Sequence, residues 1–226
     1  MINTMNTIKK NVYNKVPIDT LTEKFLHMSN TLYEKDKYTF EHCKRVAYYS
    51  SLMGKELNLL EKEMEWLITG ALFHDLGKIV IPKKILNKPG ALSVNELKVM
   101  RSHPETSAML LKAAGTHDEA VSAALYHHER YDGTGYLQDL KGKEIPLLAR
   151  IMSVADSYDA MTTNRSYSRA LENEEALEEI YINKESQFDP DIADVFIDIM
   201  YLTNPDRSNR ILPHTHQAPL RLLSRC

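Results

Sequence analysis

The sequence predicts an all-α protein built as one helical bundle. Apolar residues recur three and four positions apart along most of the chain, which is the period of amphipathic helices. No stretch alternates between apolar and polar residues as a half-buried strand would. A hydrophobic content of 43% and a charged content of 26% are typical of a globular protein. These observations predict one domain at residues 18–202, with flexible segments at 1–17 and 203–226.

Apolar stripes predict the first three helices, at residues 19–34, 39–57 and 60–74. Pro82 and Pro89 then break the segment 79–92, so no long helix is expected there. The residues that form the three stripes are, in chain order, Leu21, Phe25, Met28 and Leu32, then Val46, Tyr49 and Met53, then Met64, Leu67 and Ala71.

Start and stop signals predict the elements that follow. Ser93 and Glu96 form a capping box that opens a helix, and Pro104 must end or interrupt it. Gly115 suits a helix C-terminus, and a helix over 118–130 follows.

The last part of the chain carries equally clear signals. Three glycines predict a loop at 131–143, and Pro146 suits the first turn of a helix over 146–161. Two more helices are expected at 173–184 and 189–202, the latter with Asp189 as its N-cap.

Charge, cysteine content and hydropathy exclude several classes of protein. The formal net charge is −3, so no basic excess indicates a nucleic acid polymer as partner. Cys43 and Cys226 are too few for a disulfide framework, which favours a reducing cytoplasm. No apolar stretch approaches the roughly 18 residues that a membrane span requires. We therefore expect a cytoplasmic protein that makes no contact with a membrane.

Seven imidazole and carboxyl groups lie on or beside apolar helix faces, at five helix-borne positions. One such histidine alone is most often a hydrogen-bonded core residue. Seven on different helices, however, can converge on the centre of a bundle and bind metal there. Imidazole and carboxylate suit Fe, Mn, Zn or Co, and seven groups suit two ions that share a bridging carboxylate. The seven residues are His42, His74, Asp75, His103, His127, His128 and Asp156.

Two cations follow these groups in the sequence. Lys78 lies four residues after His74, and Arg165 comes just after the helix that carries Asp156. Beside a metal pair, either side chain could hold a phosphate oxygen. Each is also compatible with an ordinary solvated surface cation.

Several motifs resemble the HD-domain metal phosphohydrolases and, in longer runs, their HD-GYP subfamily, the phosphodiesterases of bacterial cyclic di-GMP. The resemblance extends from about Tyr38 to Met200. The segments that carry it are HDLGKI at 74–79, LNKPG at 86–90, HHERYDGTGY at 127–136, IPLLAR at 145–150, VADSYDAMT at 154–162 and QFDP at 187–190.

The resemblance implies a bundle of the HD-domain type with two divalent transition-metal ions, iron or manganese, in its core. Asp75 would bridge the two ions. One ion would be held by His42, His74, Asp75 and Asp156, and the other by Asp75, His103, His127 and His128. Lys78 and Arg165 would contact substrate phosphates. Gly133, Gly135 and Tyr136 would shape the loop beside the guanine or phosphate pocket.

The implied reaction is hydrolysis of cyclic di-GMP, or a related cyclic dinucleotide, to linear pGpG, with further hydrolysis to GMP left open. A hydroxide shared by the two metals would attack phosphorus, with Asp75 and Lys78 as the catalytic side chains. The family's Gly-Tyr-Pro is here Gly135-Tyr136-Leu137. Tyr38 stands where some members carry a glutamate that supports a third metal, so we expect two.

Three other readings stay open at this point. The chain could be an inactive receptor for cyclic dinucleotides, an HD-type hydrolase of nucleoside mono- or triphosphates, or a structural bundle with core histidines. The helix at 19–34 could pack on the core or on a second copy in a homodimer.

Overall fold

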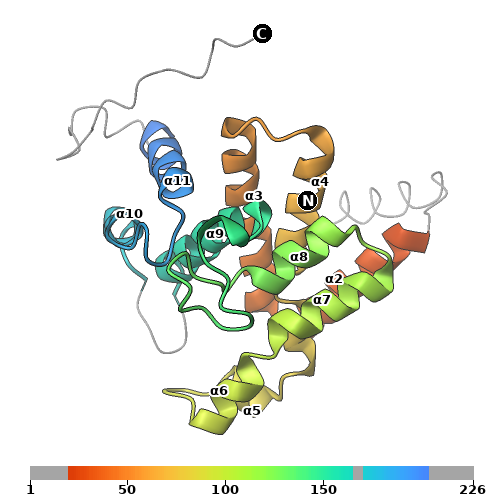
Figure 1. Cartoon of the computed structure of the whole chain (residues 1–226). Helices are drawn as coiled ribbons and strands as arrows, with labels where there is room; N and C mark the ends of the chain where they lie inside the picture. The colour runs from red at the N-terminus through yellow and green to blue at the C-terminus, as the bar shows by residue number, and fades with distance from the viewer. Residues whose placement is uncertain (1–19, 165–169, 204–226) are drawn as a thin grey trace, which may run out of the picture.

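Every regular element of the computed structural model, which describes residues 20–164 and 170–203, is a helix. The prediction of an all-α bundle is therefore confirmed. One isolated bridge joins Lys184 and Phe188 in these residues, and it extends into no strand. Four helices pack against one another at the centre of the bundle (Figure 1). They are α3 (Lys37–Glu56), α4 (Glu61–Phe73), α8 (Asp118–Tyr126) and α9 (Leu147–Thr162).

The remaining elements surround these four helices. Helices α2 (Thr20–Lys35) and α7 (His103–Ala114) cover one side together with the short 3₁₀ helix η1 (Leu76–Val80). Helices α10 (Asn173–Ile182) and α11 (Pro190–Leu202) pack on α9 from the other side (Figure 1). The short elements are α5 (Lys83–Leu86) and α6 (Val94–Met100), which pair with each other, and η2 (Gly142–Glu144).

Two apolar clusters hold the bundle together. The larger one includes an aromatic group in which Tyr49, Tyr158 and Phe196 meet edge to face at centroid distances of 5.0–6.0 Å. The smaller one joins α2 to the centre through Leu32, and through Phe25, which stacks on Phe73. Helix α2 thus packs on the core of its own chain.

Local capping signals predicted helix ends better than periodicity did. The Ser93–Glu96 capping box is present, and Gly115 ends α7 with a φ of 91°. Pro104 does not interrupt a helix: α6 ends at Met100, and Pro104 lies in the first turn of α7, where a missing N–H costs nothing. The expected helix 118–130 was too long, because α8 ends at Tyr126.

Several predictions lie outside the described residues. They concern Arg165, Cys226, the segment 1–17 and the tail 203–226 beyond Thr203, so the proposed domain boundaries stay predictions. Cys43 is a buried free thiol. Among the described helices, none is both long and apolar enough to cross a membrane.

Gly77 lets η1 approach the start of α7, the element that carries His103. Its backbone N–H donates to the Ser107 hydroxyl at 2.8 Å. A Cβ atom at Gly77 would collide with the His103 carbonyl oxygen and would lie 2.9 Å from the Ser107 backbone nitrogen. Backbone atoms of a packed helix cannot move aside as a side-chain end can, so only glycine fits here.

We expect Gly77→Ala to lower the free energy of unfolding by about 3 kcal/mol, the upper part of the range for overpacking. Gly54→Ala is the matched control, because its Cβ would meet only side-chain ends, with Met64 Cε nearest at 2.8 Å. That control should change stability by less than about 1 kcal/mol. Denaturant unfolding measures both, and equal losses would contradict the proposed clash.

Candidate metal centre

The structure brings all seven predicted imidazole and carboxyl groups together between α3, α4, α7, α8 and α9. The sequence predicted that all of them lie within helices, and this prediction is wrong for most of them. His42 and Asp156 project from the interiors of α3 and α9, and the other five stand at helix boundaries. His74 is the C-cap of α4, Asp75 precedes η1, His103 opens α7, His127 is the C-cap of α8, and His128 follows it.

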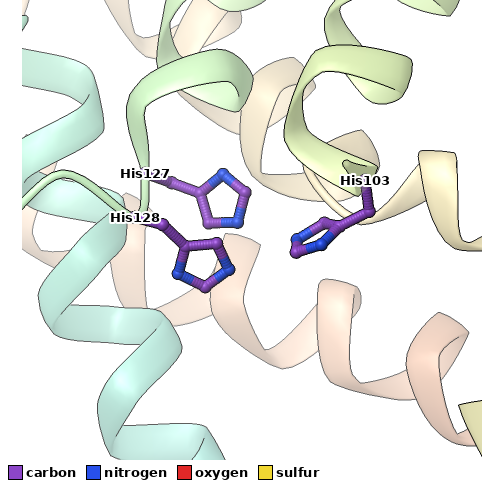
Figure 2. A group of neighbouring side chains, drawn as sticks. All are labelled: His103, His127 and His128. Carbon is purple, nitrogen blue, oxygen red and sulfur yellow. The ribbon is translucent and has the colours of Figure 1, made fainter. Parts of the chain in front are cut away.

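The boundary positions allow neighbouring residues to face the same point. Successive residues inside an α-helix point about 100° apart, so His127 and His128 could not both face inward from an intact helix. Because α8 ends at Tyr126, both rings turn toward His103, as Figure 2 shows. The ring centroids of His127 and His128 lie 4.0 Å apart.

Three groups of side chains have ligand atoms close enough to hold a metal ion. In each group the ligand atoms lie within 4.8 Å of one another. The first contains His42, His74 and Asp75, and the second contains His103, His127 and His128. A third group, of His74, His127 and Asp156, overlaps both, so the first two groups are neighbours.

Asp75 belongs to the first group and also faces the second. Its Oδ1 is 3.1 Å from His103 Nε2, whereas its Oδ2 is 3.6 Å from His74 Nε2 and 3.8 Å from His42 Nε2. The carboxylate is 2% exposed, so water cannot solvate it. One oxygen therefore faces each group, which is the arrangement that a bridging carboxylate requires.

Three histidines are oriented by the same interaction. Each has its Nδ1 within 2.7–2.8 Å of the carbonyl oxygen three residues earlier, which fixes Nδ1–H as donor. In the neutral ring, Nε2 then carries a lone pair and no proton. The three pairs are His74 with Ala71, His103 with Met100, and His127 with Ala124.

The Nε2 atoms of these three histidines are buried and lack a hydrogen-bond partner in the described part of the chain. His103 Nε2 lies 3.1 Å from Asp75 Oδ1, but both atoms are acceptors and cannot bond to each other. A cation bound by both atoms would satisfy the buried Nε2. The buried donors of this centre thus fit metal ions, and the lack of sulfur donors favours iron, manganese or cobalt over a structural zinc.

Burial keeps the rings of His74, His127 and His128 neutral. It lowers the pKa of His74, it lowers the pKa of His127 well below the usual range, and it lowers the pKa of His128 to about 3. Burial alone would raise the pKa of Asp75, but the positive charge of Lys78 holds it well below the usual value. Neutral imidazole and ionised carboxylate are the forms that bind metal. These four residues therefore need to release few protons when an ion binds.

His42 differs from the other histidines. Its Nδ1 lies 2.7 Å from Asp159 Oδ2, and its Nε2 lies 2.9 Å from Asp156 Oδ1. Burial alone would lower the pKa of His42, but these two carboxylates raise it to about 9. Asp159 was not among the predicted site residues, although its position three residues after Asp156 places both carboxylates on one side of a helix.

Lys78 lies at the edge of the centre. Its Nζ is 2.5 Å from Asp75 Oδ2, and its side chain is 21% exposed. Asp156, at 16%, is also partly exposed. The centre therefore reaches solvent beside Lys78 and Asp156.

The loop after α8 covers another edge of the centre. The Tyr136 ring stacks on His128 with a centroid distance of 5.1 Å. The Arg101 guanidinium, which the sequence analysis did not consider, lies 4.8 Å from the centre of the Tyr136 ring. A Cβ at Gly135 would lie 2.7 Å from both the Arg130 backbone nitrogen and Glu129 Cα, so glycine is required where the loop passes this backbone.

Two further backbone angles define this loop. Gly133 has a φ of 82°, which favours glycine. Leu137 has a φ of 159°, an extended conformation that a proline ring, fixed near −65°, cannot adopt. The loop of this chain thus follows a path that the family's Gly-Tyr-Pro sequence would not allow at this residue.

Comparison with known proteins identifies this architecture. The HD-domain family model matches residues 27–192. The chain is 37% identical, over 77% of its length, to the cyclic di-GMP phosphodiesterase response regulator RpfG of Xanthomonas campestris, of which it covers 47%. It is 31% identical to the 3′3′-cGAMP-specific phosphodiesterase 2 of Vibrio cholerae, over 80% of this chain and 35% of that one.

A solved structure has the same fold. The cyclic GMP-AMP specific phosphodiesterase V-cGAP3 of V. cholerae superposes with a TM-score of 0.59 at 21% identity, over 78% of this chain and 48% of that one. The chain spans about half the length of the curated relatives it matches first. The resemblance found in the sequence motifs is confirmed: the chain belongs to the HD-domain family, in its HD-GYP subfamily.

Proposed function

We propose that this chain is a cytoplasmic, metal-dependent phosphodiesterase that hydrolyses cyclic di-GMP to linear pGpG and then to GMP. The observation that carries the proposal is the pair of histidine groups on either side of Asp75, with buried Nε2 atoms that no hydrogen bond satisfies. The relatives support the substrate class. The relative named as a cyclic di-GMP enzyme is 37% identical and the one named for 3′3′-cGAMP is 31% identical, which favours cyclic di-GMP.

The proposed ligands follow the two groups. His42, His74 and Asp156 would hold one cation together with Asp75. His103, His127 and His128 would hold the other, again with Asp75. Iron or manganese suits this set of nitrogen and oxygen donors. When bound, two such cations supply a water of lowered pKa and neutralise charge on a phosphate group.

Lys78 is the side chain best located to hold the substrate. In the described structure its ammonium group is paired with Asp75 Oδ2. Cations bound to Asp75 would compete for that oxygen and leave Nζ free to donate to a non-bridging phosphate oxygen. Tyr136, whose ring contacts His128 and Arg101, lies beside the centre and would border the guanine base of the substrate. Arg165 lies outside the described residues, and its contact with a phosphate stays a proposal.

One observation favours the receptor reading. Leu137 occupies the family's proline position and adopts a backbone angle that proline cannot reach. A changed loop could alter binding of the nucleotide without disturbing the metal ligands. The receptor is therefore the second candidate, and hydrolysis separates it from the first.

A substrate panel tests the proposed activity. We expect the metal-loaded protein to convert cyclic di-GMP to pGpG at least about tenfold faster than it converts AMP or dGTP, because the loop at 131–143 serves a larger substrate. Including 3′3′-cGAMP in the panel, with products separated by chromatography, defines the nucleotide preference. Tight binding of cyclic di-GMP with full metal occupancy and no product would select the receptor instead.

Metal removal should abolish activity and lower stability. We expect about two ions per chain in the isolated protein and a midpoint of thermal unfolding about 5–10 °C lower after chelation, since ligands that bind only the folded state stabilise it. Metal analysis and thermal unfolding measure both effects. Adding Mn²⁺ back should restore activity and midpoint together, and a chelated protein with unchanged midpoint and turnover would refute the metal centre.

Replacing the shared carboxylate should affect both ions. We expect Asp75→Asn to remove at least one ion per chain and to slow hydrolysis about 1000-fold, because the amide has a similar shape but no charge. His27→Ala is the control, since this exposed histidine of α2 lies outside the centre. Metal content and turnover of the control should equal those of the unmodified chain. Two bound ions in Asp75→Asn would argue against a bridging role.

A further inference from the structure

The His42 ring is oriented by a different kind of hydrogen-bond partner from the one that orients the other histidine rings. His74, His103 and His127 each direct Nδ1 to a backbone carbonyl oxygen. His42 directs Nδ1 to the Asp159 carboxylate at 2.7 Å. This acceptor is charged, and its side chain is 1% exposed.

Arg45 holds Asp159 in place. Its Nε and Nη2 donate to the two carboxylate oxygens at 2.6 and 3.0 Å, so the pair is bidentate. A bidentate arginine fixes the plane of a carboxylate and offsets the cost of burying its charge. Asp159 Oδ2 thus accepts from Arg45 on one side and from His42 on the other.

A carboxylate behind an imidazole changes the ring as a ligand. It fixes the tautomer with Nδ1 protonated and raises the electron density at Nε2, which strengthens the bond to a cation. A backbone carbonyl does the same more weakly, because it carries no net charge. The group that contains His42 therefore has a stronger donor than the group made of His103, His127 and His128.

We propose that Asp159, backed by Arg45, is a positioning residue that makes the two metal groups unequal, so that the group containing His42 binds its ion more tightly. The inference rests on the proposed metal centre and not on the identity of the substrate. Neither Asp159 nor Arg45 would touch an ion. They act only through His42.

The chain contains a second buried pair of the same kind, which provides a matched control. Arg150 Nη1 lies 2.5 Å from Asp189 Oδ2, and Asp189 is buried. The other oxygen of Asp189 caps α11 by accepting from the backbone N–H of Asp191 at 3.0 Å. Asp189 therefore stabilises a helix end, whereas Asp159 accepts from a histidine of the centre.

The test is a stepwise titration of the chelated 226-residue chain with Mn²⁺, measured by calorimetry. Thermal unfolding of the same samples reports their stability. The unmodified chain should bind in two steps. Asp159→Asn should weaken one step by about 10–100-fold, the usual effect of removing a partner behind a metal ligand, and leave the other within twofold. His42→Ala identifies that step, because it should lose the same one.

The controls separate positioning from general damage. Asp189→Asn should lower the unfolding midpoint and leave both binding steps unchanged. If Asp159→Asn does not fold, Arg45→Gln serves in its place, because the Arg45 side chain is 38% exposed and the His42–Asp159 hydrogen bond remains. It should produce a smaller loss at the same step.

The outcomes distinguish this inference from the proposed function. Two unchanged steps in both variants, or equal weakening of both steps, would overturn the role of Asp159 and leave the metal centre intact. An unmodified chain that binds no Mn²⁺ would overturn the metal centre, and the role of Asp159 with it.

Discussion

The hydrogen bond from a histidine Nδ1 to the carbonyl three residues before it is the interaction on which this centre depends. It occurs at His74, His103 and His127, and in each case the accepting carbonyl belongs to the last turn of a helix. Carbonyls in a last turn have no partner within their helix, so they are free to accept. The end of each helix therefore supplies the acceptor that turns Nε2 inward. The end of the helix and the orientation of the histidine ring thus depend on the same carbonyl group.

The dependence of ring orientation on helix ends explains which parts of the centre could be predicted from the sequence. The residue types and their spacing identified all seven groups, because polar side chains beside apolar stripes must meet a partner in a bundle core. The exact end of α8 was not predictable in the same way. No helix breaker follows Tyr126 until Gly133, so periodicity extended the helix to residue 130. In the structure His127 is more deeply buried than His128.

Signals confined to a few neighbouring residues were more dependable than periodicity. The Ser93–Glu96 capping box, the C-terminal Gly115 and the N-cap Asp189 all lie where the sequence indicated, because a cap depends on backbone atoms within a few positions. The pairing of Arg45 with Asp159 joins residues 114 positions apart and exists only once α3 and α9 have packed together. No local pattern reports such a contact, so its part in the centre became visible only in three dimensions.

The same packing holds several electron-rich ligand atoms close together, and a cation bound among them would reduce their repulsion. Burial keeps most of the histidines neutral while Lys78 keeps Asp75 ionised, so lone pairs face a negative charge with no proton between them. Such an arrangement is unfavourable in a medium of low dielectric constant. It persists because the flanking helices fix both sides, through the apolar clusters and through the close approach at Gly77. The bundle thus offsets in advance the cost of assembling the ligands, and binding an ion requires only that Lys78 release Asp75 Oδ2.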